Sequence, residues 1–168
     1  MHKIFLKGNA KHSCTNHVKE KETKMIEPDT IKLLRECDAG VKMGVDSINQ
    51  VLNYASDQKL KDSLINCREE HNRLNEEIQK ALGRFHDDGK NPNPIAQGMS
   101  WIKTNVELVM NESDKTIANL ITDGCNMGVK SLNQYLNQYE AADETAKDIT
   151  KKLIKLEEKL RDEIRDYL

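Results

Sequence analysis

The sequence contains few aromatic residues, prolines and glycines. Phe, Trp and Tyr together account for 4% of the 168 residues, and the chain has three prolines and eight glycines. A β-sandwich or barrel normally carries many aromatic strand residues and frequent Gly/Pro turns, so this composition argues against both. We therefore expect an all-α protein, and the length is that of one domain with a sizeable core.

Long apolar runs and a surplus of either charge are also missing. No stretch approaches the roughly 18 apolar residues of a membrane span, and Ile4-Phe5-Leu6 is too short for the apolar core of a secretory signal. The formal net charge is -2 with both signs interspersed, which argues against a face that holds a nucleic-acid backbone. We expect neither a membrane nor a nucleic acid among the partners.

The four cysteines, Cys14, Cys37, Cys67 and Cys125, form no C-x-x-C pair. This spacing argues against a disulfide framework and favours free or buried thiols in a reducing compartment. We therefore expect a cytoplasmic protein.

Residues 1–27 are basic, polar and nearly free of apolar periodicity, so we expect a disordered tail, with Met25 as an alternative natural start. The tail contains His12, Cys14 and His17, a loose H-x-C-x-x-H pattern. Zinc sites need a preformed tetrahedral set of ligands, and no fourth ligand accompanies these three. We favour the interpretation that the tail binds no metal.

One segment of the sequence occurs twice. MGVDSINQVLN, residues 43–53, matches MGVKSLNQYLN, residues 127–137, at eight of eleven positions, and each copy keeps its glycine. The match extends backward at the same offset of 84 residues and resumes further on after a two-residue length change. We expect two repeats, 29–83 and 114–168, each a pair of helices joined by a short loop.

Apolar residues within each repeat recur at intervals of three and four, which is typical of amphipathic helices. Four helices with one apolar stripe each bury those stripes most simply in a four-helix bundle. The second helix begins with Ser56-Asp57 as a cap and ends near Gly83. The predicted stripes are Leu34, Cys37, Val41, Val45, Ile48, Val51 and Leu52; Leu60, Leu64, Cys67, His71, Leu74, Ile78 and Leu82; Ile117, Ile121, Cys125, Val129, Leu132 and Leu136; and Ile149, Leu153, Leu156, Leu160, Ile164 and Leu168.

The connection between the repeats, residues 84–113, is too long for a turn. Asn93-Pro94 is typical of a helix cap and first-turn proline, and a helix of about 16 residues from there spans some 24 Å. We therefore predict a helical crossover and an up-down-down-up order of helices. The crossover would place Trp101 outside the bundle with Ile102, Val106 and Val109, where it clamps the crossover and does not serve as a ligand platform.

Two repeated hairpins with a long crossover resemble the ferritin-like superfamily. Together with the G-M-S-W-I-K segment at 98–103 and the glycine-bearing repeats, residues 29–168 are similar to a bacterial family of ferritin-like domains of unknown function. The resemblance implies a bacterial four-helix bundle, and it implies no reaction.

Di-iron members of the superfamily take one Glu from each of two helices and Glu-x-x-His from each of the other two. Here Arg68 stands three residues before His71, and the repeat partner of His71 is Glu157, preceded by Ile154. The stripes of the first and third helices offer Cys, Gly, Val and Met. We therefore expect no di-iron centre.

Cys67 and His71 lie one turn apart on a predicted buried stripe. With Glu157, and Cys37 or Cys125 nearby, they form a candidate site for iron or zinc. The alternative, which we favour, is that the cysteines pack as small hydrophobes and a neutral His71 bonds Glu157 or water, so that no cofactor is bound.

The glycines of the repeats, Gly40, Gly44, Gly124 and Gly128, lie four apart on one face of their helices. Each costs about 1 kcal/mol relative to alanine inside a helix, so a compensating gain is expected. We predict that they let the first and third helices pack closely. The alternative is a pocket against bare backbone.

Three functions follow from these observations. We favour a non-enzymatic bundle that acts through a protein partner or as a homodimer. The alternatives are a metal-binding or redox protein using Cys67, His71 and Glu157, and a small-ligand sensor with a pocket between helices. His86-Asp87-Asp88 before Gly89 is a candidate acid/base pair, although a solvated turn is the simpler interpretation.

Overall fold

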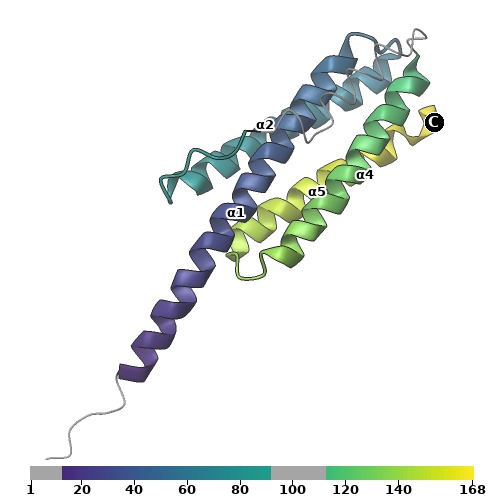
Figure 1. Cartoon of the computed structure of the whole chain (residues 1–168). Coiled ribbons are helices and arrows are strands. Elements are labelled where there is room, and N and C mark those ends of the chain that lie inside the picture. Colours follow the sequence, from purple (N-terminus) through teal and green to yellow (C-terminus); the bar gives the residue numbers. More distant parts are fainter. Residues whose placement is uncertain (1–12, 92–112) are drawn as a thin grey trace, which may run out of the picture.

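The computed structural model describes residues 13–91 and 113–168, with residues 13–27 described by their backbone alone. These residues form four α-helices, α1 (Ser13–Leu52), α2 (Gln58–Gly83), α4 (Asp114–Gln138) and α5 (Glu144–Ile164), and a short 3-10 turn, η1 (Arg165–Tyr167). Within the described ranges there is no strand, which confirms the prediction of an all-α bundle (Figure 1).

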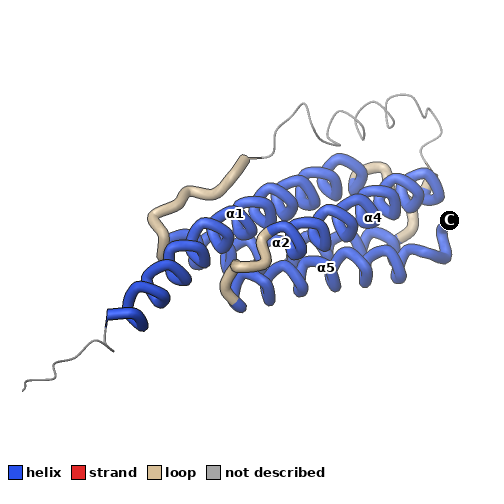
Figure 2. Tube along the Cα trace, turned by 60° about the horizontal axis from the view of Figure 1, so that its bottom comes forward, coloured by secondary structure: helices blue, strands red, loops and turns tan. Residues whose placement is uncertain are grey.

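The four helices lie side by side in one bundle (Figure 2). α1 contacts α2, α4 and α5, and α5 also contacts α2 and α4. The N–H of Ser56 donates to Asp114 Oδ1 at 2.7 Å, so α4 begins at the end of the bundle where α1 ends. The N–H of Asp143 donates to Thr30 Oγ1 at 2.8 Å, so the α4–α5 loop lies at the other end. Hence α1 and α5 run one way, and α2 and α4 the other.

Side-chain caps define the beginning of three helices. Asp57, Ser113 and Asp143 precede α2, α4 and α5, and each accepts a hydrogen bond from the N–H three residues further on, at 3.0, 3.2 and 2.7 Å respectively. Such caps satisfy N–H groups that have no partner inside the helix and contribute about 1 kcal/mol each. The predicted cap at Ser56-Asp57 is therefore confirmed at its second residue.

The predicted apolar stripes form the core. Most of their members are buried, including all the aliphatic residues of the α2 stripe. The exceptions are the exposed Leu168 and four half-buried residues, Val45, Leu52, Val129 and Leu136. The 3.6-residue period thus identified the buried faces of the helices. It was wrong at Leu168, because this residue follows the last helical turn and no longer continues a helix face.

Two predictions concern segments of the chain other than the four bundle helices: the tail, residues 1–27, and the crossover, residues 84–113. Residues 13–27 are helical, so the predicted disordered tail is wrong for that part. The segment is rich in Lys and Glu, which have high helix propensity, and extending a helix avoids the cost of starting one. The crossover helix, its clamp Trp101 with Ile102, Val106 and Val109, and the 98–103 motif lie outside the described residues, as does His12.

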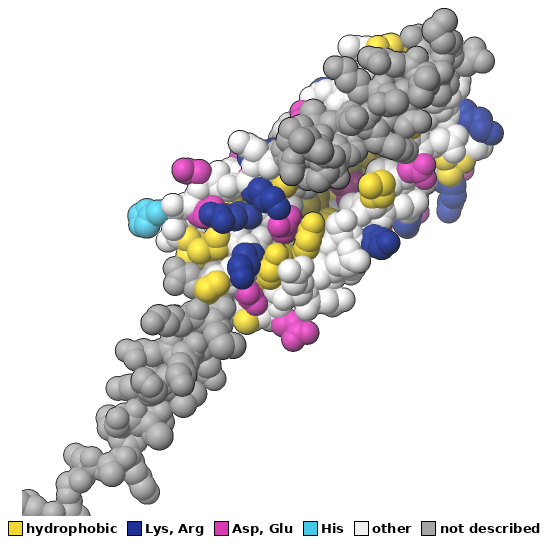
Figure 3. Space-filling view, in the orientation of Figure 1, with side chains coloured by type: hydrophobic (Ala, Val, Ile, Leu, Met, Phe, Trp, Pro, Cys, Tyr) yellow, Lys and Arg dark blue, Asp and Glu magenta, His cyan; other side chains and the backbone are white. Residues whose placement is uncertain are grey.

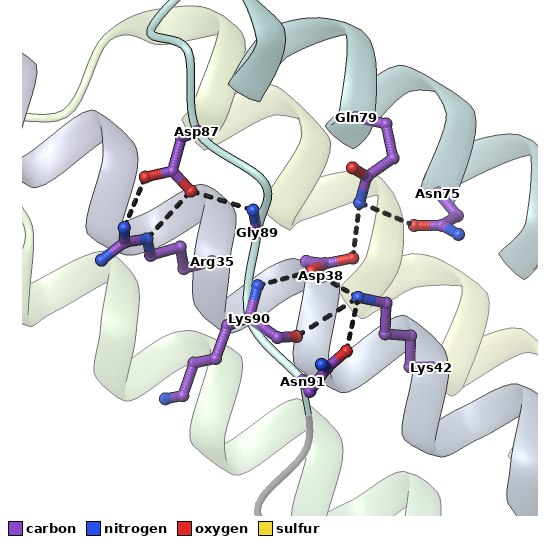
Figure 4. Close-up of polar contacts among 9 residues, drawn as sticks. All are labelled: Arg35, Asp38, Lys42, Asn75, Gln79, Asp87, Gly89, Lys90 and Asn91. Carbon is purple, nitrogen blue, oxygen red and sulfur yellow. Dashed lines mark hydrogen bonds and ion pairs between the residues drawn. The ribbon is translucent and has the colours of Figure 1, made fainter.

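The connection that follows α2 folds back onto α1 and is fastened there by a buried aspartate (Figure 4). Asp38 is fully buried and accepts hydrogen bonds from the backbone N–H of Lys90 at 2.7 Å, from Lys42 Nζ at 2.9 Å and from Gln79 Nε2 at 2.8 Å. Gly89 has a φ of +82°, and a Cβ there would lie 2.2 Å from Asp38 Oδ2. Only glycine combines that backbone angle with so close an approach.

The predicted acid/base candidate His86-Asp87-Asp88 belongs to the same connection. Asp87 forms a two-point ion pair with Arg35, with the Nε to Oδ1 bond at 3.0 Å, and Arg35 holds the pKa of Asp87 below its ordinary value through its hydrogen bonds. Asp87 also accepts from the N–H of Gly89 at 2.9 Å. The carboxylate is therefore engaged in fixing the turn, which supports the turn interpretation.

Candidate functional site

A cavity of about 350 Å³ lies between α1 and α4, with α2 and α5 beneath it. Its lining on α1 runs from Glu36 to Ile48, which corresponds to about 18 Å of helix. The walls are mostly apolar and include Met43, Leu120, Ile121 and Leu132. The volume and the apolar lining are typical of sites for small molecules.

All four repeat glycines line this cavity. A Cβ at Gly124 would meet no atom of the described residues within 4 Å, and the atoms nearest to a Cβ at Gly40, Gly44 and Gly128 belong to the side chains of α2 and α5. These neighbours do not come from the facing helix, so close packing of α1 and α4 through the glycines stays a prediction. The glycines line the cavity between the two helices, which corresponds to the pocket alternative.

A histidine and a glutamate meet at the floor of the cavity. His71 Nε2 lies 2.9 Å from Glu157 Oε1, and His71 Nδ1 lies 2.9 Å from the carbonyl oxygen of Cys67. The His71 side chain is 1% exposed and that of Glu157 is 13% exposed. The predicted His71–Glu157 contact is confirmed. Glu157 is the more exposed member of the pair and therefore the more accessible from the cavity.

Geometry favours a charged His71. Both ring nitrogens face oxygens, and two acceptors are satisfied together only when both nitrogens carry a proton. Burial alone lowers the pKa of His71, but hydrogen bonds to Cys67 and Glu157 and the charge of Glu157 raise it to about 10. We predicted a neutral His71, whereas the structure favours an imidazolium that is paired with the carboxylate of Glu157.

The repeated glycines are placed over this ion pair. A Cβ at Gly44 would lie 2.7 Å from His71 Nε2, and a Cβ at Gly128 would lie 3.6 Å from the carboxyl carbon of Glu157. In the sequence alignment of the repeats, Gly44 corresponds to Gly128 and His71 to Glu157. The glycine in each copy of the segment therefore lies over one polar residue, His71 or Glu157, and these two polar residues are in contact.

The cysteines do not complete a metal site. Cys67 Sγ lies 3.5 Å from His71 Nδ1, and Cys37 Sγ lies 3.2 Å from Thr150 Oγ1. Burial, followed by the charge of Glu157, raises the pKa of Cys125, which therefore stays a thiol at neutral pH. Within residues 28–91 and 113–168 no three His, Cys, Asp or Glu side chains are grouped in a way that could hold a metal ion.

The three described cysteines, Cys37, Cys67 and Cys125, are free and buried. Cys14 and His17 lie in the part of α1 whose side chains are not described, so the metal hypothesis for the tail stays untested. Arg161, one turn after Glu157 on α5, contacts Asn126 at 3.4 Å and Asp162 at 3.5 Å. Glu157 faces His71 and also interacts with the thiol of Cys125.

A second ion pair lies at one end of the cavity. Lys90 Nζ contacts Glu36 Oε1 at 2.7 Å, and both residues line the cavity with Tyr135. The position of Lys90 follows from the bond of its backbone to Asp38. Sequence reasoning missed Glu36, Asp38 and Lys90, because nothing in their spacing indicates that residues 84–91 fold back onto α1.

Charged side chains elsewhere on the visible face are interspersed in sign and form no continuous basic area (Figure 3). No helix among the described residues has a stretch that is both long and apolar enough to span a bilayer. The chain matches no protein-family model, and neither a curated protein nor a solved structure is significantly similar to it. The arguments for function therefore come from the site itself.

Proposed function

We propose that this protein binds a small, largely apolar molecule in the cavity between α1 and α4. The observation that carries the proposal is the set of four glycines in the cavity wall. Each glycine inside a helix costs about 1 kcal/mol, and at Gly124, an exposed position on the cavity wall, no atom of the described residues lies within 4 Å of a Cβ position. Space for a ligand is a compensation that requires a bare backbone at this position.

The ion pair on the floor supports the same proposal. A cavity that is only a packing defect is normally lined by apolar side chains alone. Here a partly accessible carboxylate, Glu157, lies beneath apolar walls. A few polar groups within an apolar pocket are the usual arrangement by which proteins orient a ligand.

We also propose that the bundle is related to the ferritin-like proteins, without their di-iron chemistry. The directions of the four helices and the sequence repeat support this relationship. The floor of the cavity carries one carboxylate and one imidazole, both engaged with each other, where a di-iron centre needs several carboxylates. We assign no reaction to the protein.

Protein contacts, our first expectation, rank second. Three large hydrophobic side chains among the described residues are exposed, Tyr54, Met127 and Leu168, and of these Met127 also lines the cavity. On the part of the surface that residues 28–91 and 113–168 form, a protein partner or a homodimer would meet mainly polar side chains. A cytoplasmic location and a bacterial origin stay predictions.

The experiment is to block the cavity without disturbing the fold. Gly124 is exposed and lines the cavity, so leucine there adds a side chain at the cavity wall. Gly83 is also exposed and does not line the cavity, and at both positions a Cβ meets no atom of the described residues within 4 Å, so leucine at Gly83 is the matched control. We expect Nile red, an uncharged apolar dye, to fluoresce with wild-type protein and with Gly83→Leu. Gly124→Leu should remain folded and lose the signal. Equal dye binding by all three proteins would refute the proposed function.

A further inference from the structure

We infer that the ligand is an elongated, uncharged molecule that donates a hydrogen bond, through a hydroxyl or an amide N–H, to the carboxylate of Glu157. This inference rests on the proposed function and specifies its ligand. It depends on three features of the cavity: the balance of its charges, the kind of polar atom that it presents, and its shape.

The charges that line the cavity cancel in pairs. His71 is paired with Glu157 at 2.9 Å, and Lys90 with Glu36 at 2.7 Å. A charged ligand would therefore bring an uncompensated charge into an apolar space, which is costly unless a partner of opposite sign is free to meet it. An uncharged ligand adds no such charge.

At the floor of the cavity the polar group that a ligand meets is a hydrogen-bond acceptor, whereas the hydroxyls of Ser47, Ser131 and Tyr135 elsewhere in the lining can donate or accept. Both nitrogens of His71 are already engaged, with Cys67 and with Glu157. An ionised carboxylate accepts hydrogen bonds at two oxygens and donates none, and the contact with His71 uses Oε1 of Glu157. A ligand therefore meets an acceptor, and it binds best when it brings an O–H or an N–H.

The glycines determine where this contact is made. Gly128 lies over Glu157, with a Cβ position 3.6 to 3.9 Å from three atoms of its side chain, and Gly44 lies over His71. Gly44 lies within the lining on α1, which runs from Glu36 to Ile48, and Gly128 lies within the lining on α4, which runs from Leu120 to Tyr135. The polar contact is therefore flanked by apolar wall on both sides, which suits an elongated molecule.

The test compares three probes of equal chain length at neutral pH: 1-octanol, octanoate and octylammonium. Binding of each probe is measured by isothermal titration calorimetry with wild-type protein, Gly83→Leu and Gly124→Leu, because Gly124→Leu is expected not to hold the dye. We expect 1-octanol to bind at least about tenfold more tightly than either ion, the factor that corresponds to about 1.4 kcal/mol. Gly124→Leu should bind none of the three.

Glu157→Gln provides an independent arm. A glutamine amide both donates and accepts hydrogen bonds, so the variant should gain affinity for octanoate and lose the preference for 1-octanol over octanoate. A preference of wild-type protein for octanoate or octylammonium overturns the inference. Equal binding of all three probes that is lost in Gly124→Leu overturns it too and leaves the proposed function standing. Failure of all three probes and of Nile red to bind refutes both.

Discussion

The substitution of alanine for Gly44 tests the geometry of the site most directly, because the same substitution at Gly124 is a control in an equivalent helix. Replacing a glycine inside a helix by alanine stabilises a protein by about 1 kcal/mol when the methyl group has room. At Gly124 there is room, since no atom of residues 28–91 and 113–168 lies within 4 Å of the new Cβ. Gly124→Ala should therefore raise the free energy of unfolding by about 0.5 to 1 kcal/mol.

At Gly44 the new methyl group would lie 2.7 Å from His71 Nε2 and 2.9 Å from its Cδ2. The ring is buried and held on both sides, by the carbonyl of Cys67 and by Glu157, so it moves only when it gives up a hydrogen bond. A hydrogen bond to a charged group contributes about 1.5 to 3 kcal/mol. After subtraction of the gain in helix propensity, Gly44→Ala should lower the free energy of unfolding by about 1 to 2 kcal/mol.

Urea unfolding followed by circular dichroism measures both variants. The expected difference between them, about 1.5 to 3 kcal/mol, exceeds the error of the method for a domain of this size. Gly40→Ala is a second control, because its Cβ would lie at an ordinary 3.8 Å from Leu153 Cδ2. Equal stability of the Gly44 and Gly124 variants would show that His71 does not lie beneath Gly44.

Further predictions concern His71, Asp38 and Asp87. Because the pKa of His71 is raised to about 10 in the folded protein from an ordinary value of 6.5, its stabilising contribution is complete below about pH 6.5 and is lost as the pH rises through about 10. Urea midpoints measured across this range should therefore fall more steeply for wild type than for Glu157→Gln; parallel curves would contradict the ion pair. Asp38→Ala leaves three donors without their acceptor and should cost about 2 to 4 kcal/mol. Asp87→Ala removes an ion pair whose Arg35 side chain is 47% exposed and should cost less than about 1 kcal/mol. Equal losses in the two aspartate variants, measured by urea unfolding, would be contrary to the assigned roles.

The helices and their buried faces could be predicted from the sequence because an α-helix repeats every 3.6 residues and apolar side chains mark its buried side. Cys67, His71 and Leu74 were placed in the core in this way, and the structure buries all three. The contact of His71 with Glu157 could be proposed because both residues fall on inward faces of adjoining helices.

The meaning of the glycines could not be predicted, because a residue without a side chain fits both a close helix contact and a cavity. The distance between α1 and α4 decides between the two, and that distance depends on the side chains of all four helices. Asp38 was missed for a related reason. Its spacing from Lys42 is that of an ordinary surface pair, and it is buried only because residues 84–91 fold over it.

Hydrogen bonds between elements hold both ends of the bundle, whereas at its middle the cavity lies between α1 and α4. At one end the backbone of Ser56 and Asp57 donates to Asp114, and the hydroxyl of Tyr167 donates to Asp57; at the other end Thr30 holds Asp143. Amide hydrogens of most helices exchange fastest near the termini, where opening is easiest. In this bundle the glycines and the cavity make the centres of α1 and α4 the weakest places. Slow exchange at the helix ends and fast exchange at their middles is the pattern that follows, and a bound ligand would remove it.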